Sequence, residues 1–578
     1  MAKIASYPVL DFSGGVRRDK SFFDFNKNEL AFAQNVEIDE RGKIRSRRGS
    51  YQFGNTLTSG SNIENSFFFQ RSAATPVTQF FCNTNDSTIT LYRLLGGRLN
   101  TALTTTSTTV ELTAAITGLT TAPSTIEIEG DLIAYTGGEG TSTLTGVTAI
   151  TRAHAAGAAV HQWIAVTQDG TALDGQRGLY YAVLNNTLIM QGRNANWKSI
   201  NNDDGITNTT VSSPPAGLFL TNYRDRLYCA GEVNPQHRTY FSNRGVPGTW
   251  TTGTDFFDAE DQRGEPIMGY KVLNDRLGIF KPNSIFTYDE IELKQRLTGV
   301  GAYNHKVIQE INGIVYTFCP NGIFATNLTE AKQIGNPVRQ YWKNFQPVYD
   351  TVTSTAYGRV ITNTFSAKFE KYYLLYIHDI TDPETANDVV LVYDTEKKTW
   401  VTFTGPFTNF FHMNGFENFK FGDRINQFRP ALFGGKDSTG GNQMVRFFEN
   451  TFVDTAGTKR GSDIFGDFLY TTDIPQPIPI RVETPLYDLT HPELFKRFRQ
   501  IRFYVERGFW NVEWRVQDDT GISPYKPLGA IAYPGKVLSF PAEAQGYRLG
   551  FRLSASNTDS LSILNGFVIE ETEVVARK

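Results

Sequence analysis

Short apolar runs, most of them five or six residues long, recur along the whole chain and alternate with polar turns. The densest runs are residues 372–377 and 389–393, which are rich in aromatic and β-branched side chains, as buried strands are. Turn-forming pairs such as Asn321-Gly322 separate runs of this kind. Helical spacing is rare, and residues 26–36 and 328–345 are its best candidates. The pattern predicts an all-β protein.

Residues 166–470 contain a loose repeat of a strand, a turn, a second strand and a polar loop that ends near a tryptophan. Trp197, Trp250 and Trp400 end three such units. In the clearest unit, residues 389–401, an apolar strand, a charged turn and an aromatic strand resemble the outer hairpin of a propeller blade, and repeats of about 40–50 residues suit such blades. We therefore expect a β-propeller-like body. The alternative is an ordinary β-sandwich with scattered core tryptophans.

Composition divides the chain into four parts. Residues 99–151 contain no lysine or arginine and are crowded with threonine, which marks an inserted small β-domain at 100–165. Inside it, residues 125–135 alternate with period two around a turn, as a half-exposed hairpin does. The expected organisation is an N-terminal arm and first hairpin at 1–55, a propeller-like body at 56–99 plus 166–470, the insert, and a C-terminal antiparallel β-sandwich at 471–578 after a proline-rich linker.

Charge and cysteine content exclude several classes of protein. The 56 Lys and Arg residues nearly balance 59 Asp and Glu residues, so overall charge would not hold a nucleic acid. Cys82, Cys229 and Cys319 are far apart, which predicts neither a disulfide scaffold nor a cysteine zinc site. No secretory signal or run of about 18 apolar residues is found. We expect folding in a cytoplasm and no membrane span.

The search for catalytic chemistry finds no nucleotide-binding, metalloprotease, serine-hydrolase or EF-hand motif. The closest histidines, His154 and His161, have no third ligand nearby in the sequence. We therefore expect no enzyme activity, no catalytic residue, no cofactor and no metal.

One acidic cluster is the exception that needs weighing, because paired carboxylates can hydrolyse a glycosidic bond. Its members are Asp255, Asp258, Glu260 and Asp261. The preceding residues 242–250 resemble the Asp box of sialidase-type propellers, but Asn243 or Arg244 stands where that box has aspartate. We interpret the cluster as a solvated loop.

Two basic clusters near the N-terminus are candidate contacts to other subunits or to nearby DNA. Neighbouring carboxylates offset their charge, and no aromatic stacking platform is interleaved with the second cluster, so we expect contacts with protein. The candidates are Arg17, Arg18, Lys43, Arg45, Arg47 and Arg48.

The opening of the chain resembles that of short-tailed phage tail nozzle proteins and packaged-DNA stabilisation proteins. The likeness lies in residues 11–16, with their Gly14-Gly15 turn, and in residues 42–49, which end in Arg47-Arg48-Gly49. Residues 223–256 resemble a blade of the same family, and the insert resembles a small β-module of phage structural proteins.

This resemblance implies a structural tail component of the virion, assembled in the host cytoplasm. Six copies would form a ring at the distal end of the tail, retain the packaged genome and conduct double-stranded DNA during ejection. Tail adaptor and tail fibre proteins would be partners. The alternatives are a receptor-binding or fibre-docking tail propeller and a propeller glycosidase.

Overall fold

The computed structural model describes residues 3–21, 24–57, 63–71, 77–84, 90–170, 173, 179–191, 197–201, 207–212, 214–230, 236–261, 263–347, 364–377, 389–404, 409–413, 431–436, 443–449, 453–454, 476–557 and 561–575. In these residues every regular element is a strand except two 3-10 helices, η1 (His305–Val307) and η2 (Asn336–Tyr341). No helix in this part of the chain is long and apolar enough to cross a membrane. The protein is all-β, as its pattern predicts.

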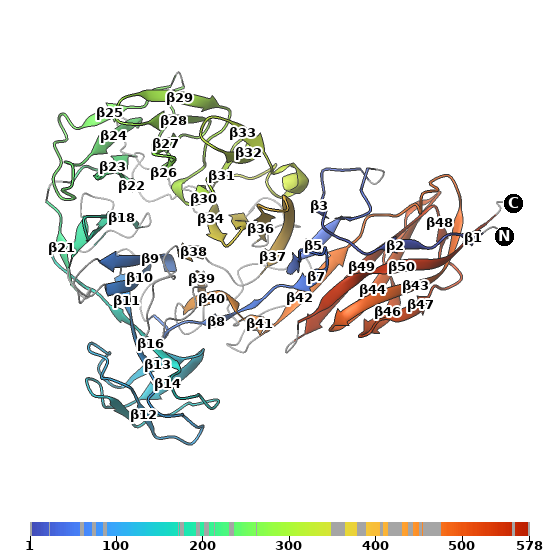
Figure 1. Ribbon diagram of the computed structural model, residues 1–578, viewed down its shortest axis with the longest axis horizontal. Helices are drawn as coiled ribbons and strands as arrows, with labels where there is room; N and C mark the ends of the chain where they lie inside the picture. The colour runs from blue at the N-terminus through green and yellow to red at the C-terminus, as the bar shows by residue number, and fades with distance from the viewer. Residues whose placement is uncertain are drawn as a thin grey trace.

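A ring of seven four-stranded antiparallel blades forms the propeller-like body in the described part of the chain (Figure 1). The innermost strands of blades 2 to 7 contact one another in sequence, and the innermost strand of blade 7 contacts that of blade 1. From inner to outer strand, the blades are: blade 1, β9 (Ile63–Arg71), β10 (Val77–Thr84), β11 (Thr90–Arg98) and β16 (Ala159–Ala165); blade 2, β18 (Tyr180–Leu184), β19 (Thr187–Gln191), β20 (Lys198–Ile200) and β21 (Thr207–Thr210), with β17 (Thr167–Gln168) at its edge; blade 3, β22 (Phe219–Tyr223), β23 (Arg226–Ala230), β24 (Arg238–Phe241) and β25 (Phe256–Asp258); blade 4, β26 (Gly269–Leu273), β27 (Arg276–Phe280), β28 (Ser284–Tyr288) and β29 (Leu293–Thr298); blade 5, β30 (Gln309–Ile311), β31 (Ile314–Cys319), β32 (Gly322–Thr326) and β33 (Ala331–Gln333); blade 6, β34 (Thr364–Phe369), β35 (Tyr372–Ile377), β36 (Val389–Asp394) and β37 (Thr399–Thr404); blade 7, β38 (Asn409–Met413), β39 (Ala431–Lys436), β40 (Gln443–Glu449) and β8 (Gly49–Gln52).

The tryptophans that mark the repeat pack where blades meet. Trp197, just before β20, is fully buried, and its ring meets that of Trp250 from blade 3 edge to face, with ring centroids 5.3 Å apart. Trp400 on β37 donates its indole N–H to the carbonyl oxygen of Ile334, which follows blade 5. These contacts explain why aromatic residues recur at the ends of the repeat units.

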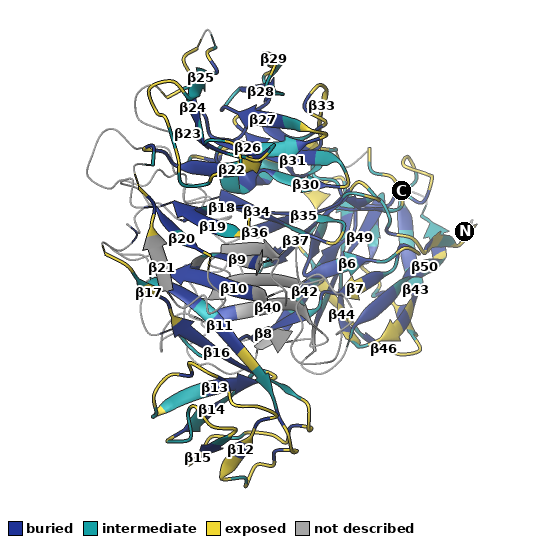
Figure 2. Cartoon of the chain, turned by 60° about the vertical axis from the view of Figure 1, so that its left-hand side comes forward, coloured by how far each residue is buried: buried dark blue, intermediate teal, exposed yellow. Residues whose placement is uncertain are grey.

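The first blade is interrupted by the insert, which holds β12 (Thr109–Glu111), β13 (Ser124–Ile128), β14 (Asp131–Tyr135) and β15 (Thr143–Thr145) around an apolar cluster that also takes in residues of the adjoining blade strands. Glu129 and Gly130 form the predicted hairpin turn, both with positive φ. The expected end at residue 165 is corrected to about 158, because β16 is the outer strand of blade 1. Figure 2 shows buried residues along the blade strands and many exposed ones in the insert.

Two packed sheets form the C-terminal sandwich, whose apolar core is shared with blade 6. The first sheet contains β43 (Lys496–Arg507), β50 (Ile563–Val574), β47 (Lys536–Ser539), β48 (Gln545–Gly546), β1 (Lys3–Ile4), β2 (Tyr7–Val9), β6 (Val36–Ile38) and β7 (Ile44–Ser46). The second contains β42 (Gln476–Glu483), β49 (Arg548–Asn557), β44 (Phe509–Asp518), β45 (Gly521–Ile522), β46 (Lys526–Ala532), β41 (Val453–Asp454) and β5 (Phe32–Gln34). The expected boundary at 470–471 lies outside the described residues.

The N-terminal segment is part of both bodies and is not an arm. The strands β1 and β2 pair with β50, the hairpin of β6 and β7 extends the same sheet, and β8 completes blade 7. Residues 26–36, a helix candidate, instead contain β4 (Glu29–Leu30), which pairs with β3 (Gly15–Val16), and β5. Residues 328–345 hold only the 3-10 helix η2 and the short strand β33.

We predict that the propeller folds without the insert when residues 100–157 are replaced by a short Gly-Ser bridge. Leu99 and Ala158 already lie side by side, since the Leu99 N–H donates to the Ala158 carbonyl oxygen at 3.0 Å. Thermal unfolding should stay cooperative, with a midpoint within a few degrees of the parent.

Extending the deletion to residue 165 provides the matched control. It removes β16 and with it Trp163, whose buried ring packs edge to face on Phe80. Loss of a buried tryptophan costs about 3–5 kcal/mol, so this longer deletion should abolish cooperative unfolding. Equal behaviour of the two deletions would contradict the corrected boundary.

Candidate functional site

The propeller and the sandwich are joined by the N-terminal segment around Asn35 and Arg47. Asn35 has φ 56°, a left-handed conformation that asparagine tolerates better than most residues. Its side-chain Nδ2 donates to Thr404 Oγ1 at 3.0 Å and to the Pro479 carbonyl oxygen at 2.7 Å, and its Oδ1 accepts from the Thr404 N–H at 2.8 Å. One side chain therefore links blade 6 to strand β42 of the sandwich.

Arg47 completes this joint and is only 2% exposed. Its Nε donates to Asn35 Oδ1 at 3.0 Å, and its Nη2 donates to the carbonyl oxygen of Thr404 at 3.0 Å. The guanidinium also lies over the Phe403 ring, 5.7 Å from its centroid. Because the charge is buried among acceptors of this chain, Arg47 is withdrawn from the set of predicted contacts with other molecules.

Two glycines in the nozzle-like residues 11–16 and 42–49 allow close contacts, Gly15 with blade 6 and Gly42 with Asp11. Gly15 has φ +62°, and a Cβ there would lie 2.7 Å from Thr399 Cβ of blade 6. Gly42 has φ +76°, and a Cβ there would lie 1.9 Å from Asp11 Oδ1. Since the Phe12 N–H donates to the Gly42 carbonyl oxygen, the two segments meet in the structure.

The first basic cluster lies beside η2. Arg17 forms two 3.0 Å bonds to Asp19. Arg18 donates to the Ala31 carbonyl oxygen and to Tyr341 Oη, each at 3.1 Å, and so contacts the propeller. Both side chains are thus engaged inside the chain.

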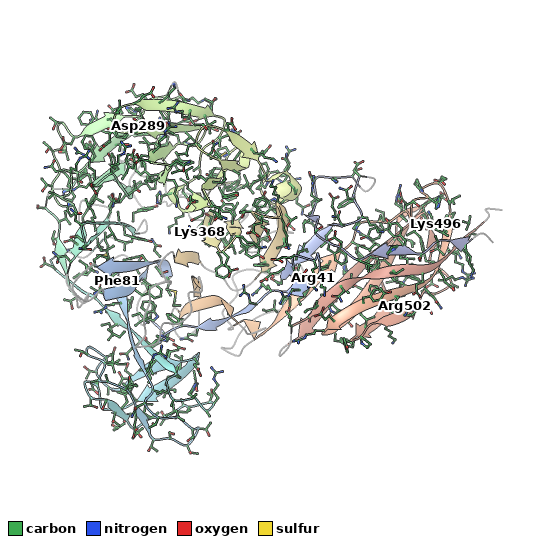
Figure 3. The ribbon with its side chains drawn as sticks, viewed as in Figure 1. Arg41, Phe81, Asp289, Lys368, Lys496 and Arg502 are labelled. Atoms are coloured by element: carbon green, nitrogen blue, oxygen red, sulfur yellow. The ribbon has the colours of Figure 1, made fainter. Side chains whose placement is uncertain are left out.

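The second cluster reaches a charged cleft of about 490 Å³ between blade 6, the β6–β7 hairpin and the sandwich. Lys43 and Arg45 line it, whereas Arg48 lies 3.9 Å from Glu37 and over the Phe369 ring. Figure 3 labels Arg41 at this junction. The lining residues are Glu37, Ile38, Asp39, Glu40, Arg41, Lys43, Arg45, Lys371, Tyr372, Lys397, Glu506 and Ile563.

Some charged side chains of the cleft form ion pairs or hydrogen bonds within the chain. Lys43 Nζ lies 2.7 Å from Glu506, and Lys397 Nζ donates to the Ile38 carbonyl oxygen at 2.6 Å. Burial lowers the pKa of Lys397, and the nearby Lys371 ammonium lowers it further. Burial also raises the pKa of Glu37, against the opposing effect of Arg48, and its Oε1 accepts no hydrogen bond.

The cleft is suited to polar contact with another molecule. Arg41 and Arg45 present exposed guanidinium groups, and each is without an ion pair or hydrogen bond among the described residues. The residues that line it within the described part of the chain are lysine, arginine, aspartate, glutamate, tyrosine and isoleucine. Sequence reasoning identified Lys43 and Arg45 but missed Lys371, Lys397 and Glu506, because these come from distant segments.

The acidic cluster of blade 3 is neutralised by basic residues of the propeller. Asp258 accepts two 2.8 Å bonds from Arg238, and Glu260 lies 3.1 Å from His237. Asp261 lies 3.4 Å from Lys281, whose side chain is fully buried. Three of the four carboxylates thus have a basic neighbour, whereas Asp255 forms no ion pair within the described residues.

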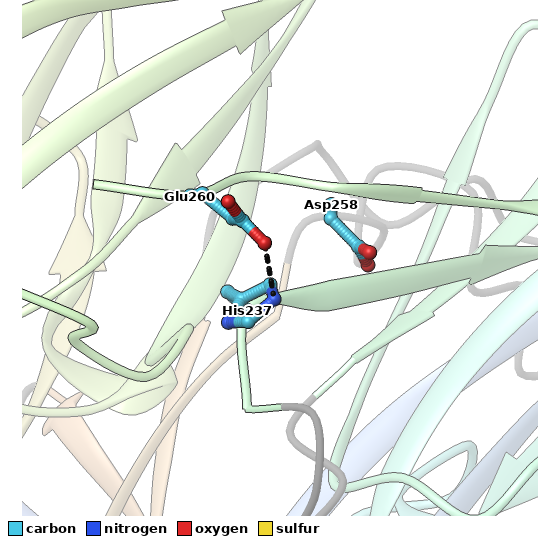
Figure 4. A group of neighbouring side chains, drawn as sticks. All are labelled: His237, Asp258 and Glu260. Atoms are coloured by element: carbon cyan, nitrogen blue, oxygen red, sulfur yellow. Dashed lines mark ion pairs between the residues drawn. The ribbon is translucent and has the colours of Figure 1, made fainter. Parts of the chain in front are cut away.

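His237, Asp258 and Glu260 nevertheless bring one ligand atom each within 4.8 Å of one another (Figure 4). A metal ion there would compete with Arg238, whose Nε and Nη2 each donate to one oxygen of Asp258. The arrangement in this structure is a pair of ion pairs.

Comparisons with known proteins do not assign the chain to a family. No known family model matches the chain, and no curated protein matches its sequence. Among solved structures it is similar to a computationally designed protein, Ika8, at 10% identity and a TM-score of 0.33, covering 69% of this chain and 99% of that chain. It is also similar to the structure of YCF48 bound to D1 peptide, at 8% identity and a TM-score of 0.29, covering 61% of this chain and 93% of that chain.

We predict that Arg47→Met destabilises the protein by about 3 kcal/mol, because it removes the buried guanidinium donor from the Thr404 carbonyl oxygen and one of the two donors from Asn35 Oδ1. Urea unfolding should show this loss as a lower midpoint. Arg45→Met, two residues away and exposed, is the matched control and should change the midpoint little. Similar midpoints for both variants would contradict the role of the joint.

We predict that Asp258→Asn costs about 1 kcal/mol of stability at neutral pH. The hydrogen bonds from Arg238 lower the pKa of Asp258, so the pair stabilises the fold above the unfolded pKa of about 3.9. That contribution disappears as the pH falls through the lower folded pKa.

Parent and variant should therefore differ in unfolding free energy at pH 7 and converge once the pH is below the lowered folded pKa of Asp258. Asp255→Asn is the control, because no ion pair is formed by Asp255 within the described residues. A difference that persists unchanged at low pH would contradict this account.

Proposed function

We propose that this chain is a structural subunit of a short phage tail. Copies of it form a ring around the path of the DNA, retain the packaged genome and conduct it during infection. The proposal rests first on the resemblance of residues 11–16 and 42–49 to tail nozzle proteins. A propeller fused to a sandwich, with a small β-domain inserted in one blade, suits a subunit with several contact surfaces.

The observation that carries the proposal is the joint around Asn35. The nozzle-like phrases contribute to the joint that fixes the sandwich to blade 6, which makes each copy one body with a set angle between its parts. A closed ring needs that property, because the rotation between neighbouring copies must be the same at every interface.

Charge also favours a conduit over a protein that grips DNA. Each lysine or arginine that neutralises a phosphate adds a salt-dependent attraction, which would oppose sliding. Arg17, Arg18 and Lys43 have partners within the chain, and Arg47 is buried. Contact with passing DNA would be brief and non-adhesive.

Ion pairing in the acidic cluster supports a non-enzymatic role. A glycosidase needs one carboxylic acid and one carboxylate free to act on the substrate. Asp258 is held by Arg238 and Asp261 lies beside Lys281, so both carboxylates already have cationic neighbours in this chain.

We predict that antibody or gold labelling of this chain on phage particles places it on the tail axis at the distal end. Image averaging should give a cyclic ring, for which the resemblance implies six copies. Label at the periphery of the tail would favour a fibre-docking propeller, and absence from particles would contradict a tail component. Purified chain assayed on polysaccharide, beside Asp258→Asn, tests the glycosidase alternative in parallel.

A further inference from the structure

The inner ends of blades 4, 5 and 6 bring together basic side chains that no element of the proposed function uses. Lys271 lies on β26, Lys368 on β34, His305 on η1 between blades 4 and 5, and Glu310 on β30. Figure 3 labels Lys368 near the middle of the ring. Three innermost strands and one short helix therefore contribute to a single site.

Packing of η1 against the inner strands sets the positions of these groups. A Cβ on Gly269 would lie 2.8 Å from His305 Cα, so the glycine allows the histidine to lie directly on β26. Lys271 is two residues farther along the same strand and so lies on the same face. On the other side, Ser366 Oγ donates to the Lys306 carbonyl oxygen, which places Lys368 on the face of β34 that borders η1.

Within the described residues the Lys271 ammonium has neither a hydrogen bond nor an ion pair, and the side chain is half-buried. Burial lowers its pKa to about 8, with a further contribution from the Lys368 ammonium. Among the described carboxylates Glu310 opposes this shift, and Glu310 also lies 3.7 Å from Lys368. One carboxylate thus serves two ammonium groups.

His305 lies on η1 beside β26, and its ring packs against Tyr180 and Phe219 of blades 2 and 3. Its Nδ1 accepts the Tyr270 N–H at 3.2 Å, which assigns the ring proton to Nε2. Burial lowers the pKa of His305 to about 3, with help from Lys271, so the ring is neutral at physiological pH. The Nε2–H makes no hydrogen bond within the described residues.

We infer that Lys271, Lys368 and His305 form a binding site for a small oxyanion, a phosphate or carboxylate group, at the inner end of blades 4 to 6. An oxyanion would accept from Lys271 and His305, and from the hydrogens of Lys368 that Glu310 leaves free. Glu310 holds Lys368 in place and limits the site to one charged group. The inference concerns the propeller of a single copy and is independent of ring formation.

The test measures how fast Lys271 reacts with pyridoxal 5′-phosphate followed by borohydride, with peptide masses giving the labelled position. Lys271 should be labelled several-fold faster than Lys332, an exposed lysine on β33, because a phosphate-bearing aldehyde binds the site and the lowered pKa leaves more of the amine unprotonated. Inorganic phosphate and, separately, acetate are then added, with sodium chloride at the same ionic strength as the screening control.

Protection of Lys271 by phosphate alone assigns a phosphate group, protection by acetate alone assigns a carboxylate, and protection by both assigns a general oxyanion site. Lys368→Met should weaken that protection about tenfold, whereas Lys332→Met should leave it unchanged. The inference is overturned if neither anion protects Lys271 more than chloride does. It is also overturned if Lys271 reacts no faster than Lys332 in a parent protein that melts cooperatively.

Discussion

The pairing of β5 with two partners is the constraint on which the architecture depends. One edge of β5 meets β37, the outer strand of blade 6, and the other meets β42 of the sandwich. A single hydrogen-bonded sheet therefore runs from the propeller into the sandwich without a break. Strand β5 spans only three residues and therefore forms few backbone hydrogen bonds, so side chains must supply further hydrogen bonds between the two bodies. Asn35 and Arg47 do this by donating to carbonyl and hydroxyl oxygens on both bodies.

The same N-terminal segment also closes the ring. Strand β8 begins two residues after Arg47, at Gly49, and completes blade 7, whose other strands lie within residues 409–449. Before β8 the segment lies in the sandwich, and both termini lie at the end of the sandwich far from the propeller (Figure 1). The joint and the ring closure share one stretch of chain, so a change that displaces Arg47 acts on both. Contacts this distant in sequence close large loops at an entropic cost that local hairpins do not have.

Features set by neighbouring residues could be predicted from the sequence. The hairpin of β36 and β37 and the hairpin within residues 125–135 follow from period-two alternation and turn chemistry. The propeller-like body follows from their repetition. The predicted end of the insert at residue 165 was wrong because the sequence of β16 resembles that of any other strand. Only its pairing with β11 assigns it to the blade.

The N-terminal segment could not be predicted for the same reason. Residues 26–36 have apolar spacing that suits a helix, yet β5 is held between two strands more than 350 residues away. The cleft is equally non-local, since Lys43 meets Glu506 and Lys371 only after the two bodies join. Arg47 carries no sequence signal that separates it from Arg45, although one is buried and the other exposed.

Balanced overall charge conceals two different local arrangements. In the cleft and in blade 3, cations and carboxylates pair across elements, as at Lys43–Glu506 and Arg238–Asp258, so that little net field remains. At the inner ends of blades 4 to 6, strand geometry places Lys271 and Lys368 beside one carboxylate. The fully buried Lys281 side chain has Asp261 3.4 Å away, whereas the half-buried Lys271 shares Glu310 with Lys368. Two ammonium groups beside one carboxylate leave a net positive charge, which an external oxyanion would balance.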